Sequence, residues 1–354
     1  KNIKNNKLII DDNTDTIDNE AIRLIHKRSQ IKKGDILFAS IGRMGDMYII
    51  EEEPLGWDIN ESVFAFTLDT SIIRQKYFYY IFKVKSTLDY LMANSSGSTF
   101  KSIKMNQLKK MIFDIPQLEK QDQIVTILDR ICNKIELQKQ EIFLLDNLIK
   151  ARFVEMFGTL HDNENGFEVV TIEDVCSLIK DGTHQTPQYT ENKEDGFKFL
   201  SSKDVMSQKI DWTDIKYIPA ELHEKLYATI KPQRNDILMS KNGVNYGVAA
   251  VNDTDEIFDI YVSLALLRPK EEIDPVFLRC VINNPETKRQ FDSSIKGIGV
   301  PNLHLGEIKK TKIFLPPIEL QKEFVSFAEQ VNKSKVVVQK SLEETQLLFD
   351  SLMQ

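Results

Sequence analysis

The sequence of 354 residues holds little of what covalent or metal chemistry requires. Its three cysteines, Cys132, Cys176 and Cys280, lie far apart, and none of them forms a Cys-x-x-Cys pair. This spacing argues against a zinc site and a disulfide framework, and it favours a reducing cytosol. No apolar run approaches the roughly 18 residues of a membrane span, and nothing resembles a signal peptide. We therefore expect a cytoplasmic protein without a membrane partner.

Motifs of common enzyme classes are missing as well. There is no GxxxxGK[ST] phosphate loop, no GxGxxG before a helix and no HExxH zinc motif. The Asn-Pro-Pro-aromatic run of amino-methyltransferases is absent, because Asn284-Pro285 is followed by Glu and Thr. The five histidines show no spacing of metal ligands. We expect no catalytic residue, no metal site and no cofactor in this chain.

One loose pattern keeps a nuclease open as an alternative. An acidic residue followed at a distance by Glu-x-Lys occurs at Asp181, Glu191 and Lys193. A second set also fits: Asp274, Glu286 and Lys288. Two unrelated hits among 53 acidic residues show how easily chance produces the pattern.

The balance of charge speaks against DNA binding by this chain alone. The 46 basic and 53 acidic residues give a net charge of −7. Whole-chain charge governs solubility and steering, however, whereas DNA binding needs only a local basic face. The acidity therefore leaves room for DNA binding beside a basic partner.

The most informative feature that is present is an internal repeat. GDILFAS at 34–40 matches NDILMS at 235–240, with an offset of 201 residues at the aspartate. LKKMIFDIPQLEKQ at 108–121 matches IKKTKIFLPPIELQ at 308–321 at an offset of 200 residues. The chain is therefore a tandem duplication.

The two copies differ in how they begin. About 67 residues separate Phe167 from NDIL in the second copy, whereas about 34 precede the aspartate of GDIL in the first. We expect the first copy to lack roughly its opening 34 residues, including any counterpart of DGTHQTPQY at 181–189. The chain, which starts with Lys, then reads as an N-terminally incomplete version of a longer protein.

A long helical pattern follows the conserved proline of each copy. Apolar residues recur at alternating steps of four and three from 124 onward and from 324 onward, as at the a and d positions of a coiled coil. No Pro or Gly interrupts 118–157, which predicts a helix about 60 Å long. We expect the two helices to pair and to hold two domains apart, although each could instead cover its own domain. The residues predicted for helix pairing and partner docking are Ile124, Leu128, Ile131, Ile135, Ile142, Leu145, Ile149, Phe324, Val331, Val338, Leu342 and Phe349.

The segments before the helices read as mixed α/β domains. Strands are predicted over 35–39, 47–50, 63–68, 198–201, 236–239, 247–251 and 263–267, and shorter helices over 74–90 and 275–292. The predicted fold is α/β of the mixed α+β kind, with two tandem domains and two long antiparallel coiled-coil helices. The predicted boundaries are 1–117 for the first domain, 118–158 for the first helix, 161–317 for the second domain and 318–354 for the second helix.

Polar, turn-forming runs supply the candidate binding residues. In DGTHQTPQY, Gly182 permits a tight bend and Pro187 stiffens the exit. Asn and Gln suit the edge of adenine, Lys and Arg suit guanine, and hydroxyl groups suit phosphates. The predicted DNA contacts are Ser40, Arg43, Lys101, Lys104, Thr183, His184, Gln185, Thr186, Gln188, Tyr189, Ser201, Ser202, Lys203, Ser240, Lys241, Asn242, Asn245 and Tyr246.

These residues carry a family resemblance that covers essentially the whole chain. DGTHQTPQY, the downstream NDILMS run and PPIELQ before a long helix resemble the specificity subunit of Type I restriction–modification systems. The resemblance implies two target recognition domains that each read one half of a bipartite double-stranded DNA site. It implies that two methyltransferase subunits dock on the helices and supply S-adenosylmethionine chemistry on adenine. Motor-nuclease subunits would add translocation and cleavage with ATP and Mg²⁺, as a defence against foreign DNA.

A third interpretation belongs to another class of protein. Two domains with paired long helices could form an adaptor that binds proteins only. Selection of a bipartite motif from random duplexes would separate DNA recognition from this alternative.

Overall fold

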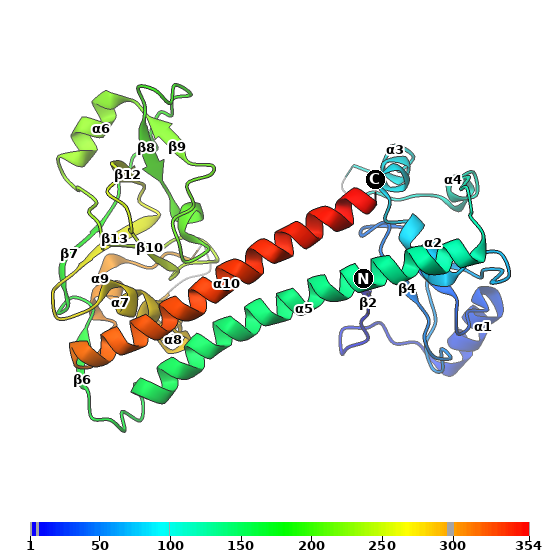
Figure 1. Cartoon of the computed structure of the whole chain (residues 1–354), viewed down its shortest axis with the longest axis horizontal. Helices are drawn as coiled ribbons and strands as arrows, with labels where there is room; N and C mark the ends of the chain where they lie inside the picture. The colour runs from blue at the N-terminus through cyan, green and yellow to red at the C-terminus, as the bar shows by residue number, and fades with distance from the viewer. Residues whose placement is uncertain (1, 5–6, 99, 296–300, 354) are drawn as a thin grey trace. The chain divides into compact units, whose positions relative to one another are not determined.

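The computed structural model describes residues 2–4, 7–98, 100–295 and 301–353 (Figure 1). The chain divides into two compact units. The first unit comprises residues 1–141 and 337–354, and the second unit comprises residues 142–336. Two long helices, α5 (Leu118–Phe157) and α10 (Ile318–Leu352), contribute to both units. Both units mix helices and strands, so the predicted fold class is confirmed.

The first unit is built around a short antiparallel sheet. Its elements are β1 (Ile3–Lys4), β2 (Lys7–Leu8), α1 (Asn19–Ser29), β3 (Ile36–Ala39), β4 (Met47–Ile49), β5 (Val63–Phe66), α2 (Gln75–Ile81), α3 (Lys85–Ala93) and α4 (Met105–Leu108), with parts of α5 and α10. The sheet has the order β4-β3-β5, and all four residues of β3 are buried. Phe38 of β3 packs edge-on against Phe66 and Phe82 on one face of the sheet, and Leu37 belongs to a second buried cluster with Ile31.

The second unit contains a larger set of strands. Its elements are β6 (Glu168–Thr171), β7 (Cys176–Asp181), β8 (Phe197–Leu200), η1 (Ser202–Val205), β9 (Lys216–Ile218), α6 (Ala220–Tyr227), β10 (Ile237–Ser240), β11 (Ala249–Val251), β12 (Phe258–Ile260), β13 (Leu264–Pro269), α7 (Pro275–Ile282), α8 (Pro285–Ser294), α9 (Leu305–Lys310) and β14 (Lys312–Leu315), with parts of α5 and α10. The strands form sheets with the orders β11-β10-β13-β7, β12-β8-β9 and β14-β6.

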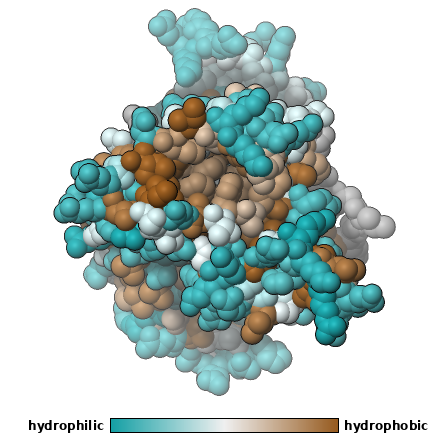
Figure 2. All heavy atoms as spheres, turned by 90° about the vertical axis from the view of Figure 1, so that its right-hand side faces the viewer, coloured by the Kyte–Doolittle hydropathy of each residue, from teal (hydrophilic) through white to brown (hydrophobic). Residues whose placement is uncertain are grey.

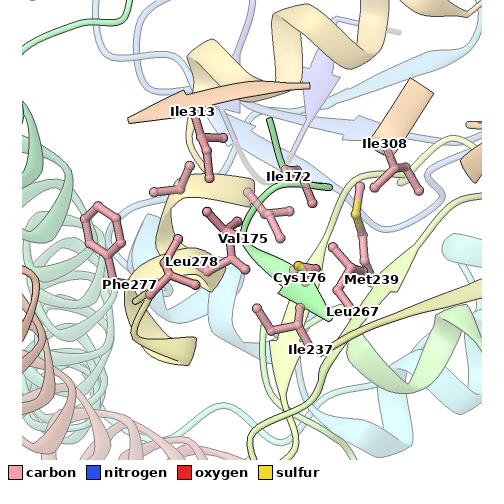
Figure 3. Close-up of a cluster of buried hydrophobic side chains, with 14 of the residues drawn as sticks. Ile172, Val175, Cys176, Ile237, Met239, Leu267, Phe277, Leu278, Ile308 and Ile313 are labelled. Atoms are coloured by element: carbon pink, nitrogen blue, oxygen red, sulfur yellow. The ribbon is translucent and has the colours of Figure 1, made fainter. Parts of the chain in front are cut away.

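The central strand β10 is buried on both faces, which explains why its sequence reads as an unbroken apolar run. One face packs with α7, where Ile237, Val175 and Phe277 belong to the same cluster (Figure 3). The other face packs against β8 and β12, where Leu238, Leu200 and Phe258 form a second cluster. Burial of these side chains is the main source of stability for the unit.

The duplication is visible in three dimensions. The order β4-β3-β5 of the first unit repeats as β11-β10-β13 in the second. The turn after the central strand also repeats, because Ile41 forms a bridge with Ser102 and Asn242 forms one with Asn302. These pairs lie 201 and 200 residues apart along the chain, as the sequence repeat does. The two copies therefore share one architecture.

The repeated Pro-x-x-Glu-x-Gln motif has a structural explanation in its glutamine. Gln121 is buried, accepts a hydrogen bond from the backbone N–H of Arg74 and donates to the carbonyls of Ile72 and Pro116. In the second unit Gln321 accepts from Asp274 and donates to the carbonyls of Glu272 and Pro316. Each glutamine thereby ties the start of a long helix to the loop before a short one.

The two copies differ in the number of strands that the described residues form. Among the described residues, the first unit has no counterpart of β6 or β7. The segment 112–115, equivalent to β14 by the repeat, consequently belongs to no strand. Phe113 is half-buried, whereas its counterpart Ile313 of β14 is 2% exposed. Figure 2, which faces the elements of the first unit, shows apolar side chains gathered in a hollow between polar ones.

Within each unit, the two long helices run antiparallel and pair along the predicted seam (Figure 1). Within the first unit, Gln138 donates to the hydroxyl of Ser341 at 2.8 Å. Within the second, Lys335 pairs with Asp146 and Arg152 pairs with Glu323. Residue numbers rise along α5 while those of their partners fall along α10, which defines the antiparallel direction. The helices also pack on their own units, through Leu128 in the first and Phe153 in the second.

Two helix predictions need correction. The predicted helix 74–90 is divided into α2 and α3, because Val84 between them is extended. The predicted helix 275–292 is divided into α7 and α8. Here Pro285 lacks the N–H that a continuing helix needs, and the Asn284 side chain caps the new helix. No helix of the described residues has the length and apolar composition needed to cross a membrane.

Candidate nucleic-acid interface

The loop 181–189 is fastened at its root to the end of a parallel strand pair. The N–H of Thr183 donates to the carbonyl of Ile260, and the N–H of Val262 donates to the carbonyl of Thr183. Gly182 lies so close to this backbone that a Cβ atom would stand 2.0 Å from the Ile260 oxygen. Glycine is therefore required here for close approach, as well as for bending.

The tip of the same loop presents side chains to solvent. His184, Gln185, Thr186 and Gln188 are exposed, and the intervening Pro187 is buried as an anchor. Amide, hydroxyl and imidazole groups arranged in this way can donate to and accept from base edges and phosphates. They remain proposed DNA contacts.

Tyr189 ends the loop as an aromatic platform. Its ring packs edge-on against Phe199, and the Lys216 ammonium lies 4.1 Å from its centroid. Partial burial raises the pKa of the Tyr189 hydroxyl above its usual value. The side chain is 43% exposed and can still meet a ligand.

Asp181, at the end of β7, lies between a lysine and a histidine. Its carboxylate oxygen Oδ2 is 2.8 Å from the Lys241 Nζ and 3.3 Å from the His184 Nε2. Asp181 and His184 are therefore close in space as well as in sequence, but the Asp181 carboxylate also forms an ion pair with Lys241. Lys241 is 4% exposed, so its prediction as a direct DNA contact is corrected: its ammonium is buried in an ion pair.

The 240–247 turn contributes fewer contacts than its polarity suggests. Ser240 is fully buried, donates from its Oγ to the Asn245 carbonyl and accepts from the Val248 N–H. Tyr246 is also buried and donates its hydroxyl proton to Asp292. Ser240 and Tyr246 are corrected from DNA contacts to residues that hold the turn together. Asn245 is exposed and Asn242 half-buried, so both stay proposed contacts.

Ser201 is the N-cap of the short helix η1, which begins with Ser202 and Lys203. The N–H and Oγ of Ser201 both donate to the Asp204 carboxylate. The Lys203 ammonium donates to Asp214, and this hydrogen bond raises the pKa of Lys203 above its usual value. Ser201 and Ser202 are half-buried and Lys203 is exposed, so all three remain proposed contacts.

Of the four DNA contacts predicted in the first unit, three are exposed and one is buried. Arg43 and Lys101 line a hollow of about 370 Å³ together with Met44, and Lys104 is exposed nearby in the chain. Ser40 is 2% exposed and donates to the Ser62 carbonyl, so its prediction as a DNA contact is corrected.

The residues of the first nuclease pattern are not brought together. Asp181 lines a small cavity beside Ile260, whereas Lys193 lines a separate hollow and lies over the Tyr217 ring. Nothing in the geometry joins Glu191 to either residue.

The second nuclease pattern is held in structural contacts. Asp274 caps α7, and Glu286 accepts from the backbone N–H groups of Leu160 and His161. Among the described residues, no group of three or more His, Cys, Asp or Glu side chains is arranged to hold a metal ion.

A buried pair near the loop root was missed by the sequence reasoning. The Nδ1 of His223 lies 2.7 Å from Asp259 Oδ2, and both residues are buried. Burial raises the pKa of Asp259, and the neighbouring His223 opposes this shift. The imidazole stacks on Phe197 at 3.7 Å, so the pair fixes α6 against β8 and β12. Neither residue belongs to a recognisable motif.

The residues predicted for helix pairing all lie buried or half-buried along α5 and α10. Other apolar side chains on these helices are exposed instead. They include Leu137, Leu144, Leu148, Val337 and Leu348. Leu137, Leu144 and Leu148 share one face of α5, since steps of seven and eleven residues return to nearly the same direction. The seam residues stay predicted for pairing and docking, and these outer faces are proposed as a further docking surface.

Comparison with known proteins gives a consistent result. The sequence matches the family described as Type I restriction modification DNA specificity domain over residues 6–146 and again over 164–345. The specificity subunit of the Type I restriction enzyme MjaIX from Methanocaldococcus jannaschii is 24% identical over 342 residues. That alignment covers 91% of this chain and 76% of the relative.

Solved structures share the fold. The S subunit of a Type I restriction–modification system from M. genitalium aligns with a TM-score of 0.54 and 16% identity, over 91% of this chain and 82% of that one. A structure described as showing complex assembly and conformational transition of the Type I system aligns with a TM-score of 0.55 and 17% identity. It covers 91% of this chain and 81% of the other. The chain therefore belongs to the family of Type I restriction–modification specificity subunits, which are DNA-recognition and assembly subunits, and it carries the family's domain twice.

Proposed function

We propose that this subunit reads a bipartite site in double-stranded DNA, one half with each unit. The observation that carries the proposal is the repeated turn after the central strand. In the first unit this turn exposes Arg43, and in the second it exposes Asn245 beside the 181–189 loop. Side chains on rigid strand ends are well suited to base readout, because the scaffold fixes their direction.

The proposed division of the chain follows the repeat. Residues 1–117 and 161–317 would be the target recognition domains, and 118–158 and 318–354 the spacer helices. The length of the helices would then set the number of unread base pairs between the two half-sites. Since DNA is the proposed ligand, the complex would act in the cytoplasm against foreign DNA.

Catalysis is proposed to lie in partner subunits, as is general in this family. Two methyltransferase subunits would bind S-adenosylmethionine and modify adenine, and motor-nuclease subunits would use ATP and Mg²⁺. The outer faces of α5 and α10, with Leu144 and Val337, would receive the methyltransferases, because exposed apolar side chains on long helices are typical of interfaces. Basic surfaces on those partners would compensate the net charge of −7 when DNA binds.

A selection experiment tests the proposal. The chain, assembled with its methyltransferase subunits, would select duplexes from a random library, and the bound DNA would be sequenced. We expect enrichment of a motif with two specified halves and an unspecified gap. Exchange of residues 161–317 for the domain of another family member should change one half only.

Two other outcomes would contradict the proposal. Absence of any enriched motif would favour a protein-only adaptor. Cleavage of DNA by the purified chain with Mg²⁺ alone, lost in Glu191→Ala, would favour the nuclease.

A further inference from the structure

We propose that the buried ion pair between Lys241 and Asp181 is the positioning element that sets the 181–189 loop for base readout. This inference rests on the proposed function, since it assigns to two residues a part in recognition of the second half-site. Neither residue is proposed to touch DNA. They are positioning residues that act through the loop.

Burial and geometry identify Lys241 as the anchor. Its side chain is 5% exposed, and its Nζ lies 2.8 Å from the Asp181 carboxylate. A lysine ammonium is rarely buried unless a partner compensates its charge. The pair therefore links the end of β7, where the loop starts, to the turn after β10.

The backbone of Lys241 joins the same junction. Its N–H donates to the carbonyl of Ser263, and its own carbonyl accepts from the N–H of Leu303. The hydroxyl oxygen of Ser263 accepts from the N–H of Ser202, at the start of η1. The three segments that hold proposed DNA contacts in this unit thus meet around Lys241.

The internal repeat separates the role of the side chain from that of the backbone. Ser40 occupies the position of Lys241 in the first unit, where its N–H donates to the Ser62 carbonyl and its carbonyl accepts from Ile103. These are the same backbone bonds, at offsets of 200 and 201 residues. The turn therefore forms without a lysine.

Lys241 and Asp181 both belong to the second unit. The strand and turn themselves do not require the buried charge, because Ser40 forms the same backbone bonds without it.

The pair also reaches the exposed tip. The same Asp181 oxygen lies 3.3 Å from the His184 Nε2, and the His184 side chain is 74% exposed. A continuous set of contacts runs from the buried ammonium through the carboxylate to an imidazole in solvent. The loop root also borders a cavity of about 120 Å³, with Asp181, Thr183 and Asp259 in its lining. The ion pair therefore supplements the backbone hydrogen bonds of Thr183 in holding the root.

The test compares Lys241→Met, Asp181→Asn and the double variant, each assembled with the methyltransferase subunits. Affinity is measured for the duplex that the wild type selects and for duplexes with single base changes in either half. We expect Lys241→Met to reduce discrimination at the second half-site by more than about tenfold, as when one partner of a buried charge pair is lost. Discrimination at the first half-site should not change.

The double variant and a surface control sharpen the expectation. Loss in the double variant should be far less than the product of the two single losses, because both variants remove the same pair. Lys241→Arg should restore much of the discrimination. Lys225→Met provides the matched control, since Lys225 forms an exposed ion pair with Glu221 and should have no effect.

A measurement without DNA separates this inference from the proposed function. Hydrogen exchange of the amides in 182–189 should become faster in Lys241→Met than in the wild type, with no change in the first unit. Unchanged exchange rates of these amides in Lys241→Met would show that Lys241 does not anchor the loop. Equal loss of affinity at both half-sites, with a lower melting temperature, would overturn the positioning role and leave a structural one. If the wild type selects no motif, but exchange in 182–189 is still faster in Lys241→Met, the proposed function is wrong. The role of Lys241 as the anchor of the loop would then still hold.

Discussion

The side chain of Gln321 accepts a hydrogen bond from the backbone N–H of Asp274 at 2.9 Å, and the repeat reproduces it. Gln121 accepts the equivalent bond from Arg74 at 2.8 Å. Both glutamines are fully buried, and each satisfies backbone groups on two segments. The motif that marks the repeat in the sequence therefore has a packing role and lies away from the proposed DNA contacts.

Replacement of this glutamine should be costly. In Gln321→Leu, the N–H of Asp274 and the carbonyls of Glu272 and Pro316 lose their partner inside the protein. We expect a loss of about 2–4 kcal/mol in the free energy of unfolding of the second unit, because buried unsatisfied groups keep their desolvation cost. Denaturant titration monitored by circular dichroism measures it.

The matched control is Gln140→Leu, an exposed glutamine on α5. It should alter stability by less than about 0.5 kcal/mol. Equal stability losses in the two variants would show that the buried hydrogen bonds contribute nothing.

The seam between α5 and α10 gives a second prediction. Ile131 and Ile142 lie half-buried at a/d positions, so aspartates there would place charge in an apolar contact. We expect the double variant Ile131→Asp, Ile142→Asp to unfold more readily by about 2 kcal/mol or more and to lose assembly with the methyltransferase subunits. Thermal melting and size-exclusion chromatography report the two effects.

Aspartates on the outer face should separate these effects. Leu137→Asp with Leu148→Asp changes residues that are 64% and 46% exposed, so the melting temperature should hardly change. Binding of the methyltransferase subunits should nevertheless weaken, by more than about tenfold. If assembly survives this change, the outer face is not the docking surface.

Hydrogen exchange provides a third prediction, on the difference between the copies. The amides of β14 face β6 in a regular antiparallel pair, from Lys312 opposite Thr171 to Leu315 opposite Glu168. The equivalent segment 112–115 has no strand partner among the described residues. We expect its amides to exchange at least roughly tenfold faster than those of 312–315. Amides of the central strands β3 and β10 should be similarly protected, and slow exchange at 112–115 would contradict the structure.

Much of the fold could be predicted because repetition and periodicity are properties of the sequence. The run around Leu238 is apolar on both faces, and the a/d pattern from Ile124 continues without Pro or Gly; both features appear directly as β10 and α5. Strand β6 could not be predicted in this way. Its pairing depends on β14, which lies more than 140 residues further along the chain.

The candidate contacts were harder to assign, for a physical reason. The side chain of a polar residue in a turn can either face solvent or form hydrogen bonds within the fold. The residue type alone does not distinguish these two cases. Ser240 and Lys241 were predicted as contacts, but their partners are Asn245 and Asp181, which only the folded chain brings within reach. The repeat did contain one usable signal, the difference between Ser40 and Lys241 at equivalent positions.

Gly182 gives the last prediction, because its surroundings leave no room for a side chain. A Cβ at this position would lie 2.0 Å from the carbonyl oxygen of Ile260, a fixed backbone atom of β12. In Gly182→Ala the loop root must therefore move away from the strand. We expect a loss of about 2 kcal/mol or more in stability and weaker binding to the second half-site only. Gly306→Ala is the matched control: Gly306 lies in α9 with no atom near its would-be Cβ, and alanine there should stabilise the helix by up to about 1 kcal/mol. Wild-type binding by Gly182→Ala would mean that the root tolerates displacement and that close approach at Gly182 is not needed for recognition of the second half-site.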